Sequence, residues 1–396
     1  MEGGPRVPLQ SRVHARRRPR DPPGPPHGDS ARGDIGIPVG VGGAPRGIEH
    51  RARREQAVRP GPERGFAGSR SGAVFAALLA VLAGAVLLSA STGPVRIPLE
   101  RYLDILLRGG ADTSARVLLS LRLPRALLGV LVGGALSSSG VAFQALLRNP
   151  LADPYILGVS GGAAVGALSV ALFLPTDASP FLPLFAFAGA ALSALAVFLL
   201  ARRRGGVSPE RLILMGVVVG AFLNAVIMLM VTLSPPGKIP GALYWLMGDL
   251  GLATPGRVGT LLPYVAAGAA VLFALSRGLD LMLLGDHAAF QTGLSVERVK
   301  TATYLTASLL AGSVVAVSGL IGFVGLIVPH GARVLVGSGH RKLLPAAFLM
   351  GSAFLVLSDV IARTASPSGE LPVGAVTALA GAPFFLYLLR RNGGRS

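Results

Sequence analysis

The stretch QALLRNPLADPYILGVSGG, residues 144–162, lies between two long apolar runs but holds an arginine, an asparagine, two prolines and an aspartate. A proline disfavours helical geometry at the residue before it, so Pro150 and Pro154 predict the end of one helix and the start of the next. Asp153 directly before Pro154 fits a helix N-cap followed by proline at the first helical position. The stretch therefore predicts a tight re-entry turn between two apolar helices, formed by Asn149, Pro150, Asp153 and Pro154.

The composition around this turn is that of a membrane protein. The chain has 396 residues, of which 51% are hydrophobic and 14% charged, and its mean hydropathy is +0.61. A membrane-spanning helix needs about 20 apolar residues, and about ten segments meet this need. They are residues 71–90, 123–145, 155–174, 181–201, 212–233, 258–275, 301–319, 321–337, 343–362 and 372–389. We therefore expect an all-α polytopic protein, in which the short eighth span, with Pro329 and several glycines, is either broken or buried within protein, where such backbone can be satisfied.

Two regions follow from this pattern. Residues 71–396 form the expected ten-helix membrane domain, and residues 1–70 are rich in Pro, Gly and Arg without apolar periodicity. Such a segment cannot bury a core, so residues 1–70 are expected to be a disordered tail. An arm that touches acidic lipid or nucleic acid is one interpretation and a solvated extension is the other. We expect the membrane as a partner and no nucleic acid.

Orientation is predicted from the basic residues, because loops rich in Lys and Arg stay on the cytoplasmic side. Placing the tail inside also places Arg148 inside, and it makes both termini cytoplasmic in a multi-pass protein of the cell membrane. Six arginines between Arg96 and Arg125 then lie outside, against the rule. Either this connection is simply long, or it forms a docking surface for an acidic soluble partner.

A weak internal repeat adds to the membrane pattern. Gly133, Ser139-Gly140, Pro150 and Gly158 match residues of the same type 179 positions further on, where Pro150 meets Pro329. The offset spans five crossings, an odd number, so the two copies would run in opposite directions through the bilayer. Inverted repeats of this kind are a transporter architecture. The match also predicts a second, inverted break at Pro329.

The chemistry that is missing narrows the function. No GxxxxGK[ST] phosphate loop occurs, the chain has no cysteine, and the six histidines have no metal-ligand spacing, so we expect neither ATP hydrolysis nor a cofactor nor a metal in this chain. Ion-coupled transporters need intramembrane carboxylates. The nearest candidate, Asp359, stands four residues before Arg363 and predicts a helical ion pair. A transport protein driven by a partner fits best; a secondary transporter and a membrane-embedded enzyme are the alternatives.

One connection is a candidate for receiving energy from such a partner. The segment LLGDHAAFQTGLSVERVK, residues 283–300, predicts a short helix with Asp286 as N-cap and Gly293 at its end. This helix could lie in a groove of a soluble motor domain, although an ordinary loop is equally compatible with the residues. Asn224, in the fifth span, either faces a polar path or bonds a neighbouring helix.

Several segments, in order, resemble the FecCD-type permeases, the membrane subunits of ABC importers for ferric siderophores, haem and vitamin B12. They are LRLPRALLGVLVGGALSSSGVAFQALLRNPLADPYILGVSGGA, LYWLMGDL, LLGDHAAFQTGL, SGLIGFVGLIVPHGARVLVG, LSDVIAR and ELPVGAVTALAGAPFFLYLL. The resemblance covers residues 71–391. Residues 1–70 are not part of the family pattern.

The resemblance implies a type II ABC importer architecture with ten helices in a five-helix inverted repeat. It implies two cytoplasmic ATPase subunits, an extracytoplasmic substrate-binding protein, and a second permease copy or close homologue. By resemblance, Arg122, Arg125 and Arg363 dock the binding protein, and Asn224 faces the path. The segment from Leu284 to Leu294 looks like the helix that couples to the ATPase, through Leu284, Gly285, Asp286, Ala289, Gly293 and Leu294. The implied cargo is a ferric siderophore, with haem and vitamin B12 as alternatives.

Overall fold

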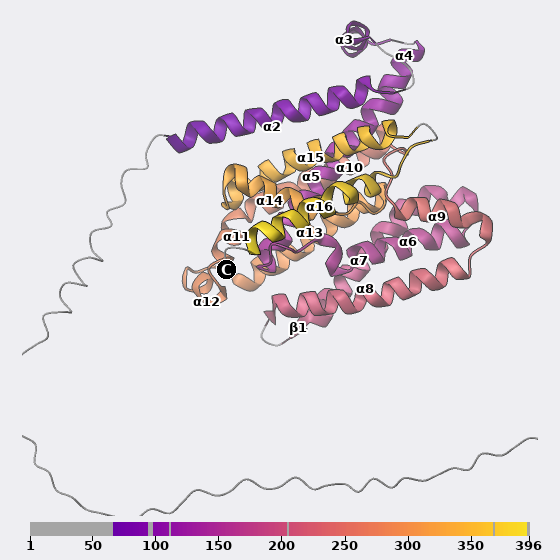
Figure 1. Ribbon diagram of the computed structural model, residues 1–396. Helices are drawn as coiled ribbons and strands as arrows, with labels where there is room; N and C mark the ends of the chain where they lie inside the picture. Colours follow the sequence, from indigo (N-terminus) through magenta and orange to yellow (C-terminus); the bar gives the residue numbers. More distant parts are fainter. Residues whose placement is uncertain (1–65, 94–97, 111, 204–205, 367–368, 394–396) are drawn as a thin grey trace, which may run out of the picture. The chain divides into compact units, whose positions relative to one another are not determined.

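The computed structural model describes residues 66–93, 98–110, 112–203, 206–366 and 369–393 (Figure 1). The expected tail lies outside these residues except for residues 66–70, which are helical and begin the first helix earlier than expected. Arg96 also lies outside the described residues. The described part of the chain is almost entirely helical, with one hairpin of two antiparallel strands of two residues each.

Ten helices correspond in order to the ten expected spans, so the all-α polytopic fold is confirmed. They are α2 (Phe66–Ser91), α5 (Leu123–Leu146), α6 (Val159–Phe173), α7 (Leu182–Ala201), α8 (Pro209–Thr232), α10 (Pro255–Ala274), α13 (Val296–Ser318), α14 (Val324–Val336), α15 (His340–Thr364) and α16 (Val373–Gly393). Within the described ranges, seven stretches are long and apolar enough to cross a membrane; α6, α14 and the apolar part of α16 are shorter.

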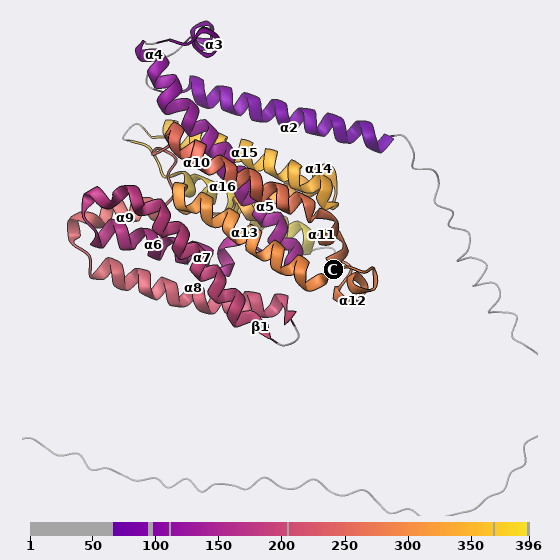
Figure 2. The same ribbon diagram turned by 180° about the vertical axis from the view of Figure 1, so that it is seen from behind.

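Shorter elements connect these helices. They are α3 (Leu99–Arg108), α4 (Thr113–Arg116), the π-helical turn η1 (Val117–Arg122), η2 (Pro154–Leu157), η3 (Thr176–Phe181), β1 (Arg202–Arg203), β2 (Gly206–Val207), η4 (Pro236–Lys238), α9 (Ile239–Leu246), α11 (Ser276–Met282) and α12 (Asp286–Gln291). In Figures 1 and 2, α12 and β1 lie at one end of the long helices, and α3 and α4 lie at the other. We call these the α12 end and the α4 end.

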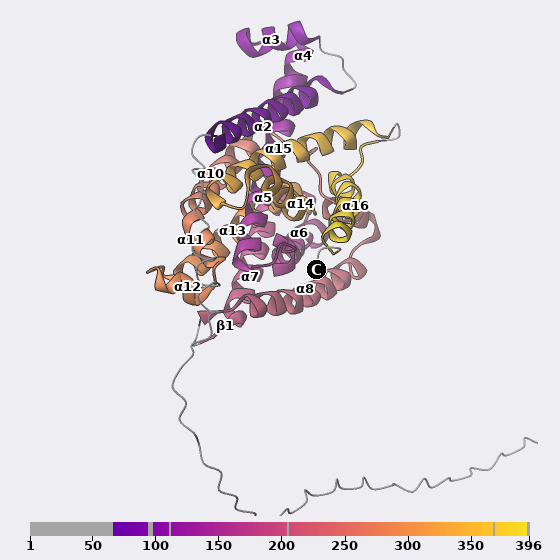
Figure 3. The same cartoon turned by 60° about the vertical axis from the view of Figure 1, so that its left-hand side comes forward.

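The two halves of the chain repeat one packing pattern. In each half the third long element is the shortest, α6 in the first and α14 in the second. Helix α5 packs on α14 and α15, and α13 packs on α6 and α7, so each central helix packs on the other half's third and fourth helices. Figure 3 shows α5 and α13 inside the bundle, with α16 and α8 outside. This exchange is what a five-helix repeat produces.

The predicted register of the repeat is wrong. A shift of 179 residues places Gly158, just before α6, on Gly337, just after α14, although α6 and α14 are the matching helices. The predicted break at Pro329 is also wrong, because α14 continues through it. The break lies earlier, between α13 and α14, where Phe323 has a left-handed φ of 68°.

Helix α14 tolerates Pro329 because another side chain compensates for the missing N–H. A proline at this position leaves the carbonyl of Gly325, four residues earlier, without its helical donor. The amide nitrogen of Gln144, at the end of α5, lies 3.5 Å from that oxygen and 3.3 Å from the oxygen of Leu326. Gln144 is 2% exposed, so this link is shielded from water. One half of the repeat therefore completes the backbone of the other.

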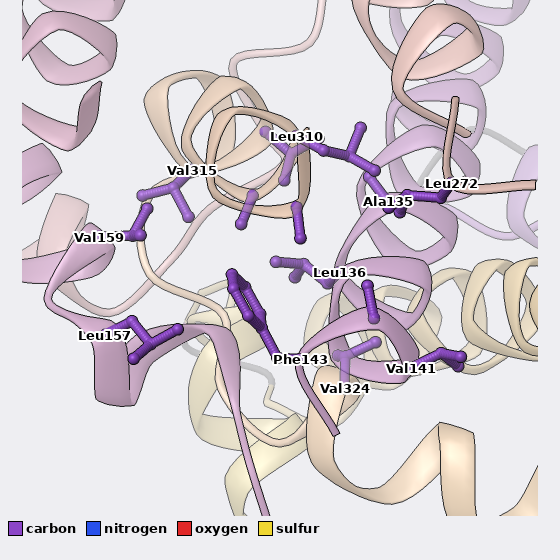
Figure 4. Close-up of a cluster of buried hydrophobic side chains, with 14 of the residues drawn as sticks. Ala135, Leu136, Val141, Phe143, Leu157, Val159, Leu272, Leu310, Val315 and Val324 are labelled. Atoms are coloured by element: carbon purple, nitrogen blue, oxygen red, sulfur yellow. The ribbon is translucent and has the colours of Figure 1, made fainter. Parts of the chain in front are cut away.

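The core forms where α5 crosses α13 and α14 (Figure 4). Phe143 of α5 is fully buried and meets the ring of Tyr304 of α13 edge-on, with centroids 6.1 Å apart. Leu136 of α5 and Val324 of α14 belong to the same buried cluster. The crossing is close because Gly140 has no side chain: a Cβ there would fall on the carbonyl oxygen of Gly325.

Replacing Gly140 by alanine tests this crossing. We expect Gly140→Ala to lower the melting temperature of the detergent-purified protein, since forced overpacking costs about 1–3 kcal/mol. The matched control is Gly84→Ala in α2, where a Cβ would meet nothing within 4 Å. That control should be neutral or stabilising, because glycine in a helix interior costs about 1 kcal/mol relative to alanine. Equal melting temperatures for the two variants would contradict the close crossing.

Candidate functional site

The segment predicted to couple to an ATPase is a short helix at the α12 end. Helix α12 runs from Asp286 to Gln291, and Gly293 follows it with a left-handed φ of 82°, as expected for a terminating glycine. The prediction that Asp286 is the N-cap is wrong. Gly285 is the N-cap, with a φ of 103°, and the Asp286 carboxylate makes no cap hydrogen bond.

Helix α12 has one buried and one exposed side. Ala289 is fully buried, and its carbonyl accepts from the hydroxyl and the backbone N–H of Thr292 and from the N–H of Leu294. Leu284 is 67% exposed and Phe290 is 73% exposed. Two large apolar side chains at a surface otherwise rich in charge form a small patch that a protein partner could cover.

The Asp286 carboxylate joins α12 to two other parts of the chain. One oxygen pairs with the guanidinium of Arg148, in the turn after α5, and the other lies 2.6 Å from the ammonium of Lys300 in α13. Burial alone raises the pKa of Asp286, but the hydrogen bonds and charges of Lys300 and Arg148 outweigh it, so its pKa lies below its ordinary value. Asp286 is therefore held as a carboxylate between two cations.

The predicted re-entry turn is confirmed in its local geometry. The Asp153 carboxylate accepts from the N–H of Tyr155 at 2.8 Å, and Pro154 is the first residue of η2. The Asn149 side-chain oxygen accepts from the N–H of Leu151 at 2.9 Å, and Pro150 is exposed. The chain thus leaves α5 and re-enters the bundle through two side-chain-capped turns.

Arg148 starts this turn with an unusual backbone. Its φ is 47°, the left-handed conformation that a glycine normally takes after a helix. Its Nε donates to the carbonyl of Met282, at the end of α11, at 2.9 Å, and its terminal nitrogen pairs with Asp286. Glycine would fit the backbone better but would supply neither bond, so the arginine holds the turn against α11 and α12.

A charged groove of about 700 Å³ opens beside these residues. Its walls come from the hairpin and the starts of α8, α12 and α13. They consist of Arg203, Gly206, Val207, Ser208, Arg211, Asp286, Glu297 and Lys300. Of these residues, sequence reasoning singled out only Asp286 as a site residue, and it missed Glu297 and Lys300. Pairing acids with bases across the segment 283–300 would have flagged Glu297 and Lys300.

The three arginines predicted to dock a binding protein gather at the α4 end. Arg122 donates to the carbonyl of Ala90 at 3.0 Å, and Arg363 donates to the hydroxyl and carbonyl of Ser89. Both guanidinium groups therefore lie on the last carbonyls of α2, which carry the negative end of the helix dipole. The docking role is not tested by this geometry and stays a prediction.

Arg125 and Arg363 share one buried carboxylate. Asp359 is 1% exposed and lies 2.9 Å from a terminal nitrogen of Arg125 and 3.1 Å from Nε of Arg363, which confirms the predicted helical ion pair. A second terminal nitrogen of Arg125 bonds Glu370 at 2.7 Å. Glu370, which sequence reasoning missed, is 47% exposed in its side chain, against 11% for Arg125. The cluster is buried at Asp359 and open to solvent at Glu370.

Asn224 lies on the exposed side of α8. Val217 and Met228 lie on the same helical side, at spacings of seven and four residues, and they are 56% and 72% exposed. This side of α8 is an apolar stripe with one amide in it. The structure leaves it uncovered within the described part of the chain.

Removing the charge of Asp359 tests the buried cluster. We expect Asp359→Asn to lower the stability of the purified protein by about 3–5 kcal/mol, because it leaves the buried guanidinium of Arg363 without an anion and that of Arg125 with Glu370 alone. Asp104→Asn on α3 is the control, since Asp104 pairs only with exposed arginines. Thermal unfolding in detergent measures both. A loss no larger than that of Asp104→Asn would show that the cluster does not hold α15 to α5.

Comparison with known proteins agrees with this geometry. The model of the FecCD transport family matches residues 77–391. An uncharacterized ABC transporter permease protein of Bacillus subtilis is 41% identical over 329 residues, which cover 80% of this chain and 93% of that one. The cobalamin import system permease protein of Halobacterium salinarum is 45% identical over 285 residues, covering 72% of this chain and 76% of that one.

A haem transporter and a solved structure extend the comparison. The hemin transport system permease protein of Yersinia pestis is 38% identical over 286 residues, covering 71% of this chain and 85% of that one. A solved structure of an ABC transporter in an inward-facing conformation superposes with a TM-score of 0.71 at 29% identity. It covers 81% of this chain and 99% of that one.

Proposed function

Because the chain belongs to the FecCD transport family, we propose that it is the membrane-spanning subunit of an ABC importer that carries a ferric siderophore into the cell. The observation that carries the proposal is the family match across residues 77–391, which includes both end clusters and α12. Separate subunits would bind and hydrolyse ATP, and this chain would form the translocation path.

The α12 end is proposed to face the cytoplasm. It holds Arg148, Lys300 and the hairpin arginines, in agreement with the preference of basic loops for that side. The exposed Leu284 and Phe290 of α12 would be covered by an ATPase subunit, one for each of two permease copies. Both termini would then be cytoplasmic.

The apolar stripe of α8 supports a second permease copy. Leu214, Val218 and Phe222, at spacings of four residues, form a second apolar stripe on another side of α8, and each is more than half exposed. A pair of such subunits would place the path between them, and Asn224 would line it. Lipid could also cover apolar side chains, but the single amide at mid-helix fits a path better than hydrocarbon.

An ion-coupled secondary transporter is less well supported. Asp359 is 1% exposed, and two arginines neutralise it. A proton or ion relay needs a carboxylate that can change its charge during the cycle. An external source of energy, such as ATP hydrolysis in a partner, fits this arrangement.

Uptake into vesicles tests the proposed function. We expect vesicles that hold this chain, its ATPase and its binding protein to accumulate a radiolabelled ferric siderophore only when ATP is present on the ATPase side. Omitting the ATPase is the control. Uptake that continues without the ATPase and stops when the ion gradient is collapsed would contradict the proposal.

Cobalamin is a second candidate cargo. It is favoured by the 45% identity to the cobalamin import system permease protein, whereas the iron(3+)-hydroxamate permease protein of Bacillus subtilis is 37% identical over 316 residues. Haem is a third candidate, from the haem transporter of Yersinia pestis. The same vesicles, tested with each cargo in turn, decide among the three.

Docking of the binding protein would use the arginine cluster at the α4 end. Of the three arginines, Arg125 can change its partner most readily. Its guanidinium can release Glu370 and bind a carboxylate of the binding protein while it stays paired with the buried Asp359. Charge attraction of this kind guides association and depends on salt.

Two variants with opposite effects test this docking. We expect Arg125→Gln to weaken binding of the binding protein about tenfold, that is by about 1.4 kcal/mol. Glu370→Gln should strengthen it, because it removes the internal competitor. Arg257→Gln is the control, because Arg257, a partly exposed arginine in α10, bonds the carbonyl of Leu252. Binding to the permease in lipid nanodiscs at low salt measures all three, and affinities that move together or not at all would contradict the docking role.

A further inference from the structure

The ammonium of Lys300 meets three acceptors from three separate parts of the chain. They are the second oxygen of the Asp286 carboxylate in α12 at 2.6 Å, the carbonyl of Val207 in β2 at 3.1 Å, and an oxygen of Glu297 in α13 at 3.3 Å. A lysine has three N–H donors, so each finds one acceptor. The side chain is 5% exposed. Such a shielded and fully bonded cation holds its partners firmly.

Glu297 completes the attachment of the hairpin. Its second oxygen accepts from the N–H of Val207 at 3.0 Å, while Lys300 bonds the carbonyl of the same residue. Both polar backbone groups of Val207 are thus held by side chains of the first turns of α13. Gly206 makes the approach possible, because a Cβ there would collide with the Glu297 carboxylate.

The opposite side of Asp286 extends the connection to α5. Arg148 bonds Asp286 and the carbonyl of Met282 while its own backbone stays left-handed. Through Asp286 and Lys300, α12 is therefore joined to the turn after α5, to the first turns of α13 and to the hairpin that leads into α8. The turn, the first turns and the hairpin lie at the ends of α5, α13 and α8, that is, of the two central helices and of the helix that carries Asn224.

We propose that Lys300 is a positioning residue that transmits movement of α12 to the hairpin before α8, while the Asp286–Arg148 pair ties α12 to the turn after α5, so that all three move together. The proposal rests on the proposed function, in which α12 contacts the ATPase. Helices shift as rigid units when the elements that join them are firmly bonded. Without Lys300, α12 could move with the ATPase while the ends of the path stay in place.

The ratio of ATP hydrolysed to cargo imported tests the transmission. In the complete complex in vesicles, we expect Lys300→Met to reduce uptake about tenfold while ATP hydrolysis continues. Lys342→Met is the matched control, since Lys342 is an exposed lysine that bonds only the hydroxyl of Ser71. Asp286→Asn and Gly206→Ala should also raise the ratio of ATP hydrolysed to cargo imported. The first weakens the bond between Lys300 and α12, and the second pushes the hairpin away from Glu297. If Lys300→Met does not assemble, these two variants decide.

Equal loss of uptake and hydrolysis, or an unchanged ratio in all three variants, would overturn the transmission. The parent complex separates this failure from that of the proposed function. If the parent imports cargo with ATP and the variants keep its ratio, only the transmission is wrong. If the parent does not import any tested cargo, the proposed function fails.

A distance measurement gives a readout that does not depend on cargo. The chain has no cysteine, so spin labels can be attached at Arg203→Cys in the hairpin and His287→Cys in α12, both exposed positions. With the ATPase bound, we expect the distance between the labels to be the same with and without ATP, and to spread over a wider range when Lys300→Met is added. A distance that changes with ATP in the parent, or a distribution that Lys300→Met leaves unchanged, would overturn the proposal.

Discussion

The fold depends on completing the backbone hydrogen bonds at two places in the crossing of α14, namely at Pro329 and in the extended segment just before the helix. Hydrocarbon offers no water to an open N–H or carbonyl, so each must find a partner within the protein. Gln144 supplies this at Pro329, where its amide nitrogen reaches the carbonyls of Gly325 and Leu326. Tyr155 does the same where the chain runs extended between α13 and α14, because its hydroxyl bonds both the N–H and the carbonyl of Ile321 at 2.9 Å.

These two side chains come from the first half of the chain and serve the second half. The bundle is thus locked at its centre, where glycines such as Gly140 let the helices approach closely, and its charged groups gather at the two ends. At the α4 end, arginines bind Asp359 and the last carbonyls of α2. At the α12 end, Asp286 and Lys300 join the connecting segments. A rigid centre with bonded connections at each end suits a subunit that responds to one partner on each side of a membrane.

Sequence reasoning predicted the parts of the structure that depend on local pattern. The ten spans, the N-cap at Asp153 and the Asp359–Arg363 pair follow from apolar length, proline geometry and helical spacing. It failed where contacts between distant segments decide. The break predicted at Pro329 was wrong because Gln144 satisfies the open carbonyl from another helix. The register of the repeat was wrong because the 179-residue shift does not superpose α6 on α14. Asp286 was assigned to a cap because its partners, Arg148 and Lys300, are brought to it only by the fold.

Labelling of a single cysteine tests whether α12 lies on the cytoplasmic side and is covered by an ATPase. Phe290 is 73% exposed in a chain without native cysteine, so Phe290→Cys offers one site for a maleimide that cannot cross membranes. We expect labelling in inside-out vesicles, none in right-side-out vesicles, and protection when the ATPase is bound. Labelling in right-side-out vesicles, or in inside-out vesicles regardless of the bound ATPase, would contradict this expectation.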